Sequence, residues 1–145
     1  MKSLFVGGNF ERKGGLHLLE AFRALRHLGI ELHLVTKDRI APEQALFVYN
    51  VMEPNSDALK RLYHACDIFT LPTFGDTIPM VLSEAGAAGL AIVSTDIAGI
   101  PEIVRPGDTG LLVRPGDTNS LTEALRRLIV DASSLFGVGD LTGTG

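Results

Sequence analysis

The chain has 145 residues, of which 46% are hydrophobic and 21% charged, as in a single globular domain with its own core. Its net charge is −4 and its lysines and arginines do not cluster, which argues against a nucleic-acid partner. The single cysteine, Cys66, excludes an intrachain disulfide and fits a reducing compartment, so we expect a cytoplasmic protein. No apolar run approaches the length of a membrane span.

Short apolar stretches alternate with helical patterns along the chain. The stretches that predict strands are Ser3–Val6, Glu31–Val35, Leu46–Tyr49, Ile68–Leu71, Ala91–Ser94 and Gly110–Val113. The patterns that predict helices run from Leu16 to Leu28, from a cap at Asn55 or Ser56 to Cys66, from about Pro79, and from Thr118 to about Val130, with a short turn at Pro101. His17, His27 and His33 are expected on the surfaces of these elements.

The ends of the helices carry recognisable signals. Gly29 follows the first helix in the position where a left-handed residue ends a helix. Asp117 precedes the last helix and is the residue that we expect to cap it. From Ala132 onward the pattern has neither helical nor strand period, so we divide the chain into a domain over 1–131 and a poorly ordered tail over 132–145.

The alternation of strands and helices predicts an α/β fold. Strands that are apolar throughout favour a parallel sheet covered on both faces, and the usual doubly wound (Rossmann-like) order for six strands is 3-2-1-4-5-6. In this order strands one and four are neighbours, and ligands bind at the carboxyl ends of the strands, where the winding reverses. The loop after strand one and the loop after strand four are therefore expected to meet at one crevice.

The loop after strand four leads into a helix without an obvious side-chain cap. Pro79 suits the first helical position, and Ile78 before it has no oxygen with which to cap. The N–H groups of Met80, Val81 and the residue after them would then be available to an anion such as a phosphate. Alternatively, Thr77 caps a helix that starts one residue earlier.

Two carboxylates bracket this helix start. Asp76 precedes it, and Glu84 lies in its second turn, with its side chain expected to lean back toward the start. An acid on each side of an anion-binding helix end fits a ligand with hydroxyl groups on both sides of a diphosphate. A solvated loop aspartate and a surface glutamate are the alternative, and a glycoside-hydrolase pair of acids is a further one.

The loop after strand one combines glycines with a lysine. Gly7 and Gly8 allow the backbone to approach a ligand closely, and Lys13 can reach a phosphate as a point charge. The loop is neither a Walker loop nor a dinucleotide fingerprint. On its own it fits a solvated lysine between turn glycines better than a phosphate site.

Three stretches carry a resemblance to a known family. Val6–Gly15 followed by Leu19–Phe22, the long stretch Leu71–Val104, and Thr109–Asp117 resemble the C-terminal donor-binding domain of the group 1 glycosyl transferases, which are glycosyltransferase family 4. The resemblance covers about Leu4 to Val130. It implies one half of a GT-B fold and a retaining enzyme that moves a sugar from a nucleotide diphosphate to an acceptor, as in polysaccharide biosynthesis.

The resemblance also implies roles for individual residues. Lys13 would neutralise the diphosphate of a UDP-, GDP- or ADP-sugar, Glu84 would hold its ribose, and Asp76 would contact the donor sugar. The amides near Met80 and Val81 would bind phosphate, without a metal or another cofactor. Base recognition is expected near Tyr49–Met52.

The chain departs from the family in several places. Asp76 stands where a glutamate is usual, and Gly8 stands where an arginine is common. The N-terminal acceptor domain is not recognisable, so we expect a domain that binds donor but transfers sugar poorly alone, with membrane association only through the missing part. The alternatives are a non-enzymatic nucleotide-binding module or an inactive truncated fragment.

The residues around Cys66 favour a structural role over a metal site or a catalytic one. His64, Cys66 and Asp67 lack a second group of ligands at metal-binding spacing, and Cys66 shares the apolar face of its helix. We expect Cys66 in the core.

Overall fold

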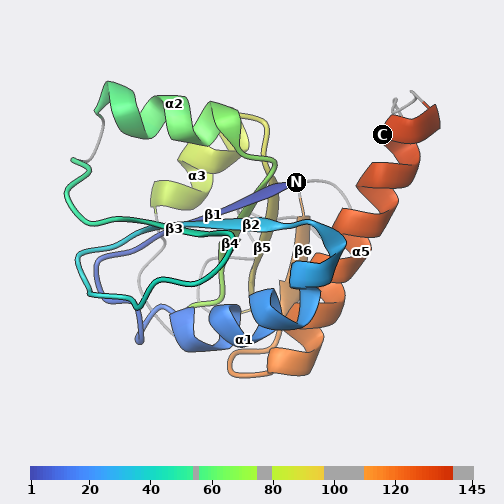
Figure 1. Ribbon diagram of the computed structural model, residues 1–145, viewed down its shortest axis with the longest axis horizontal. Coiled ribbons are helices and arrows are strands. Elements are labelled where there is room, and N and C mark those ends of the chain that lie inside the picture. The colour runs from blue at the N-terminus through green and yellow to red at the C-terminus, as the bar shows by residue number, and fades with distance from the viewer. Residues whose placement is uncertain (54–55, 75–79, 97–109, 139–145) are drawn as a thin grey trace.

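A parallel sheet forms the centre of the protein. The computed structural model describes residues 1–53, 56–74, 80–96 and 110–138. The strands are β1 (Lys2–Val6), β2 (Glu31–Val35), β3 (Leu46–Tyr49), β4 (Ile68–Leu71), β5 (Ala91–Thr95) and β6 (Gly110–Val113). Their order is β3-β2-β1-β4-β5-β6, and every neighbouring pair is parallel, which confirms the predicted α/β topology (Figure 1).

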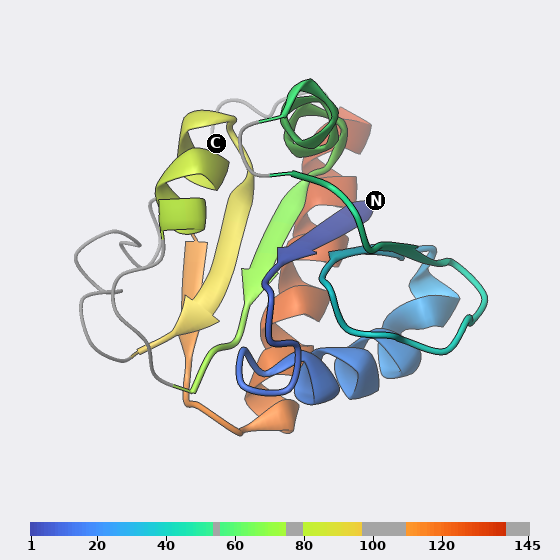
Figure 2. The ribbon, with the colours of Figure 1, turned by 90° about the vertical axis from the view of Figure 1, so that its left-hand side faces the viewer.

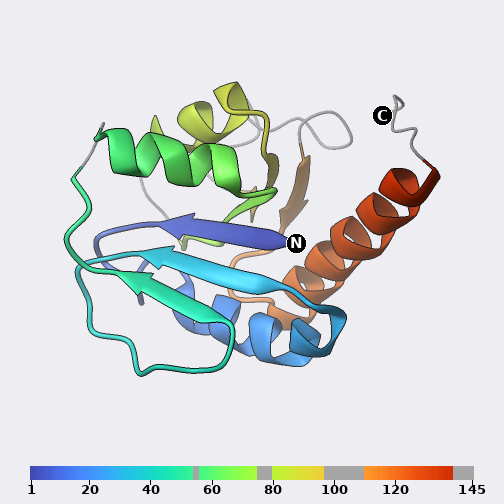
Figure 3. The same cartoon turned by 45° about the horizontal axis from the view of Figure 1, so that its top comes forward.

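Helices cover both faces of the sheet. The first face carries α1 (Gly15–Leu25), continued by a 3₁₀ turn η1 (Arg26–Leu28), and α5 (Thr118–Val138). The opposite face carries α2 (Asp57–Ala65) and α3 (Met80–Ala87), which lie above the sheet in Figures 1 and 3. This arrangement follows from strands that are apolar on both sides: β4 is buried at every residue.

The predicted helical faces form the core. Leu18, Phe22 and Leu25 of α1 are buried against the sheet from one side, and Leu59 and Tyr63 of α2 are buried on the other. Phe5 and Phe69 on neighbouring strands are fully buried between the two helical layers. Burying such side chains is the main source of stability in a fold of this kind.

Three predicted signals at helix ends are confirmed: the caps at Ser56 and Asp117 and the left-handed Gly29. The Ser56 hydroxyl accepts a hydrogen bond from the Leu59 amide at 3.2 Å, so Ser56 caps α2. The Asp117 carboxylate accepts from the Ser120 amide at 3.0 Å and from its hydroxyl at 2.8 Å, and caps α5. Gly29 has φ of 85°, the left-handed conformation that ends the first helix.

Two expectations about local structure are wrong. The backbone of α5 continues to Val138, beyond the end expected near Val130. His33, expected on the surface, is only 7% exposed. It stacks on Phe47 with a ring-centroid distance of 4.7 Å, and the hydroxyl of Tyr49 lies 2.8 Å from its Nδ1. The predicted turn at Pro101 lies outside the described residues.

Within the described residues, none of the helices combines the length and apolar character that crossing a lipid bilayer requires.

Candidate functional site

The carboxyl ends of β1, β2 and β3 open onto a cavity. The three strands run in the same direction in Figure 3, and the segments that follow them gather at that end of the molecule. The cavity has a volume of about 590 Å³, which is within the usual range for small-molecule sites. We call it the lysine pocket, and it is lined by Val6, Gly7, Gly8, Lys13, Val35, Thr36, Lys37, Tyr49, Asn50, Val51, Met52, Glu53 and Val81.

Gly7 and Gly8 of the first glycine loop line the lysine pocket. The Gly7 amide donates to the carbonyl of Val35 at 2.9 Å, which joins the ends of β1 and β2. A β-carbon at Gly7 would lie 3.1 Å from Cγ of Lys13, whereas one at Gly8 would meet nothing within 4 Å. Gly7 therefore lets the lysine stem pack against the backbone, and Gly8 leaves space above the loop.

The loops after β1 and β4 touch each other. Gly14 has φ of 80°, and a β-carbon there would lie 1.9 Å from the carbonyl oxygen of Pro72. The Phe74 amide donates to the Arg12 carbonyl at 3.4 Å. Figure 2 shows the β1–α1 loop at the front of the molecule, between the β2–β3 loop and the segment that follows β4. Two loops that are distant in sequence thus meet as the strand order requires.

Part of the predicted site lies outside the described residues. Asp76, Ile78 and Pro79 fall in this gap, and so does the choice between a helix starting at Pro79 and one capped by Thr77. α3 is described from Met80 onward, and Val81 in its first turn lines the lysine pocket. The beginning of α3 is therefore at the same cavity as Lys13.

Glu84 does not line the lysine pocket. It is half-buried and lines a second cavity of about 250 Å³ between α2 and α3, together with Leu59, Lys60, Tyr63, His64, Ala87 and Ala88. We call this the α2–α3 pocket. The Tyr63 hydroxyl donates to Glu84 at 3.4 Å, and burial raises the pKa of Tyr63 so that the hydroxyl stays protonated. The structure thus directs this carboxylate toward Tyr63, not into the lysine pocket as expected, and its role in nucleotide binding stays a prediction.

The loop after β3 lines the same pocket, and its role in base recognition stays a prediction. Tyr49, Asn50, Val51 and Met52 all line it, and Val51 is 93% exposed. The Asn50 side-chain amide is engaged in holding the neighbouring loop, because it donates to the carbonyls of Thr36 and Asp38, each at 2.9 Å.

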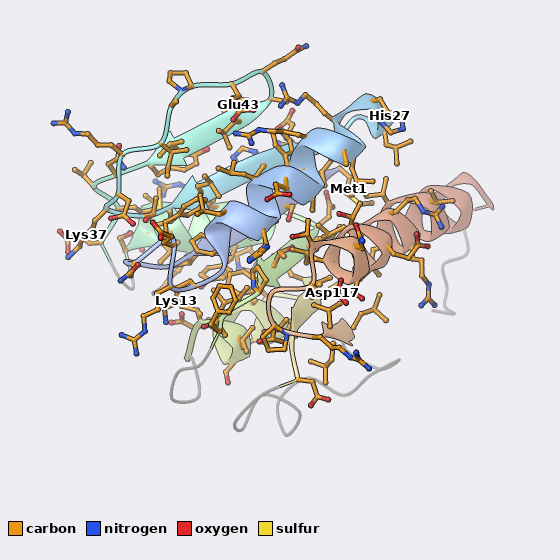
Figure 4. All side chains as sticks on the ribbon, turned by 90° about the horizontal axis from the view of Figure 1, so that it is seen from below. Met1, Lys13, His27, Lys37, Glu43 and Asp117 are labelled. Carbon is orange, nitrogen blue, oxygen red and sulfur yellow. The ribbon has the colours of Figure 1, made fainter. Side chains whose placement is uncertain are left out.

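Sequence reasoning missed Lys37. It follows β2, the strand next to β1, and Figure 4 shows it at the same end of the molecule as Lys13. Its position just past the carboxyl end of a neighbouring strand was the signal that could have identified it.

The cysteine is confirmed as a core residue. Cys66 is 7% exposed, and burial raises the pKa of its thiol to about 11, so it is a protonated thiol at neutral pH. Among the residues that the structure describes, no three histidine, cysteine or acidic side chains are grouped as a metal site would require.

The fold and the pocket define a class: a doubly wound α/β domain with a lysine-bearing cavity at the carboxyl ends of its parallel strands. The sequence profile described as "Glycosyl transferases group 1" matches residues 2–131. The chain therefore belongs to the group 1 glycosyl transferases, which confirms the family that the sequence motifs indicate.

Relatives and solved structures agree with this family. A D-inositol 3-phosphate glycosyltransferase of Corynebacterium aurimucosum is 33% identical over 82 residues, which are 57% of this chain and 20% of that protein. The chain thus spans about a fifth of the length of this relative.

Two solved structures share the fold. Sucrose-phosphate synthase from Thermosynechococcus elongatus superimposes with a TM-score of 0.73 at 23% identity, over 91% of this chain and 37% of that one. The pneumococcal O-GlcNAc transferase GtfA, solved with UDP and GlcNAc, gives a TM-score of 0.74 at 13% identity, over 90% of this chain and 29% of that one. Both are glycosyltransferases, so the fold is one half of the GT-B architecture.

Proposed function

We propose that this domain binds the nucleoside diphosphate of a nucleotide-sugar donor in the lysine pocket. The observation that carries the proposal is that one cavity of about 590 Å³ combines Lys13 on the glycine loop, the first turn of α3 and the loop after β3. A lysine and a helix start are both groups that bind phosphate, and the cavity is large enough for a nucleotide.

The proposal assigns one part of the ligand to each wall. The base lies against the loop from Tyr49 to Met52, where Val51 exposes an apolar side chain. The diphosphate lies between Lys13 and the amides at Met80 and Val81. The ligand is a UDP-, GDP- or ADP-sugar, and it is bound without a metal.

The two acids take the hydroxyl groups of the donor. Asp76, from the predicted motif, contacts the donor sugar. Glu84 accepts hydrogen bonds from the ribose, and for this its carboxylate leaves the Tyr63 hydroxyl, which it meets at 3.4 Å in this structure. Such a long bond is weak, so exchanging it for two ribose hydroxyls has a small energetic barrier.

The chemistry proposed for the whole protein is transfer with retention of configuration. The bond between the sugar's anomeric carbon and the diphosphate oxygen breaks, and the diphosphate leaves with the electron pair. The acceptor oxygen then bonds to the same face of the sugar, and its proton passes to the departing diphosphate. The domain's contribution is electrostatic, because Lys13 and the α3 amides stabilise the negative charge that develops on the leaving group. The acceptor is held by a further domain.

Calorimetric titration of the chain with UDP, GDP and ADP tests the binding step. We expect one of them to bind in the micromolar to millimolar range and the other two to bind less tightly, because the β3 loop reads the base. Absence of heat with all three at millimolar concentration would contradict the proposal. A Lys13→Gln variant with the same affinity as the parent chain would place the ligand elsewhere.

A further inference from the structure

Lys37 lies in the lysine pocket but has no role in the function described so far. It is exposed, it comes from the segment that follows β2, and it lines the same cavity as Lys13. The strands β1 and β2 are paired from Lys2 with Glu31 to Val6 with Val35, so the two lysine-bearing segments leave the sheet side by side. Figure 4 shows both labelled lysines at this end of the molecule.

The backbone that carries Lys37 is held on both sides. The Thr36 amide donates to the Tyr49 carbonyl at 3.2 Å. The Asn50 side chain then spans the lysine, donating to the carbonyl before it, on Thr36, and to the carbonyl after it, on Asp38, each at 2.9 Å. A side-chain amide that bridges the residues on either side fixes where the lysine stem leaves the chain.

The same segment is tied to the glycine loop. The Asp38 carboxylate accepts a hydrogen bond from the Phe10 amide at 2.7 Å, and the Asp38 amide donates to the Thr36 hydroxyl at 3.3 Å. Asp38 is not among the residues that line the cavity. Its hydrogen bond to Phe10 therefore holds the two loops together without adding negative charge to the lining of the pocket. The distance between the origins of the Lys13 and Lys37 side chains is therefore set by the fold.

The charge of the pocket agrees with a ligand that carries several negative charges. Among the described residues, its charged lining groups are Lys13, Lys37 and Glu53, so the positive charge exceeds the negative. Gly8 adds no charge, and a β-carbon placed on it would meet no atom beyond its chain neighbours within 4 Å. A nucleoside diphosphate carries more than one negative charge at neutral pH, and a single lysine leaves part of that charge without a cation.

We propose that Lys37 is a second cation for the diphosphate, acting with Lys13 from the neighbouring loop. This inference rests on the proposed function, since it specifies the charge recognition of the same pocket. Lys37 donates to the phosphates, which carry the negative charge of the ligand, whereas the nucleoside lies against the β3 loop. A consequence is that Lys37 favours diphosphates over monophosphates.

The test is a titration of the parent chain and of Lys37→Gln with a diphosphate, the monophosphate and the nucleoside of the base that binds most tightly. We expect the Kd for the diphosphate to rise about tenfold, as for the loss of one charge-assisted hydrogen bond. The Kd for the nucleoside stays unchanged, and the monophosphate shows a smaller rise. Lys37→Arg retains most of the affinity, and the dependence of the diphosphate Kd on salt becomes shallower in Lys37→Gln.

Lys2→Gln is the matched control, because it removes an exposed lysine at the start of β1, at the opposite end of that strand from the lysine pocket. Its diphosphate Kd is expected to equal that of the parent. A parent chain that binds and a Lys37→Gln variant with unchanged Kd would overturn this inference alone. An equal loss for diphosphate, monophosphate and nucleoside would also overturn it, since Lys37 would then contact the nucleoside. No binding by the parent chain would overturn the proposed function and this inference with it.

Discussion

The lysine pocket and the α2–α3 pocket are built in different ways. The first lies at the carboxyl ends of three strands, and its walls are loops joined by backbone contacts, such as the Gly7 amide on the Val35 carbonyl at 2.9 Å. The second lies between two helices and is lined by side chains from both, such as Leu59 and Tyr63 of α2 and Glu84 of α3. Their volumes are about 590 and 250 Å³.

The difference concerns both charge and rigidity. The lysine pocket presents Lys13 and Lys37 on segments held by the strand ends, so the backbone that carries its cations is fixed. The α2–α3 pocket presents Glu84 with one long hydrogen bond to Tyr63, so its carboxylate can change partner at little cost. A fixed cationic site beside an adaptable acid suits a ligand that carries phosphates and hydroxyl groups.

The largest expected effect is on the backbone that builds the lysine pocket. Gly14→Ala would put a β-carbon 1.9 Å from the Pro72 carbonyl oxygen at a residue with φ of 80°. We expect the free energy of unfolding to fall by about 2–4 kcal/mol, from the clash and the left-handed backbone together. Urea denaturation followed by circular dichroism measures it.

Gly29→Ala separates the two causes. Gly29 has a similar φ of 85° but has open space around it, so the loss there is expected to be only about 1 kcal/mol. Equal losses in both variants would show that the contact between the β1 and β4 loops contributes nothing.

The second effect is on the charge of the lysine pocket. Lys13→Gln removes the cation on the glycine loop, and we expect the affinity for the best nucleoside diphosphate to fall by about 2 kcal/mol, or roughly thirtyfold. Calorimetry measures the change, and Lys13→Arg, which keeps the charge, is the matched control. A fall of the same size in Lys13→Arg would mean that shape and not charge decides binding.

The third effect tests whether the two pockets serve one ligand. Glu84→Gln keeps the size of the side chain but removes its charge, and we expect nucleotide affinity to fall by about 1–3 kcal/mol if the carboxylate accepts ribose hydroxyls. The difference in affinity between the parent chain and the variant should then be smaller for the 2′-deoxy diphosphate than for the ribonucleotide. Unchanged affinity for the ribonucleotide would remove Glu84 from the site and leave it a partner of Tyr63 alone.

The smallest effect concerns the bond between Tyr63 and Glu84. Tyr63→Phe removes a hydroxyl whose raised pKa keeps it protonated, so the loss of stability is expected to be about 0.5–1 kcal/mol and constant between pH 6 and 9. Releasing Glu84 should leave nucleotide affinity the same or slightly higher. A marked fall in affinity would show instead that Tyr63 orients Glu84 for the ligand.

Much of the fold could be predicted because the signals are local. The bounds of β2, β3, β4 and β6 match the expected ones, since each is a short apolar run between turn residues. Ser56 and Asp117 act as helix caps because a short polar side chain next to a helix has few other partners. His33 was not predictable in this way, because the rings that bury it come from another strand, β3.

The site divides along the same line. The sequence by itself determined the order of the strands, the glycine loop with Lys13, and the family, because these depend on local pattern and on motif. Only the tertiary structure decided that Lys37 lies beside Lys13 and that Glu84 meets Tyr63. Those two facts depend on contacts between segments far apart in the chain. The pairing of strands and the packing of helices decide where those side chains point, and no pattern within a single segment contains that information.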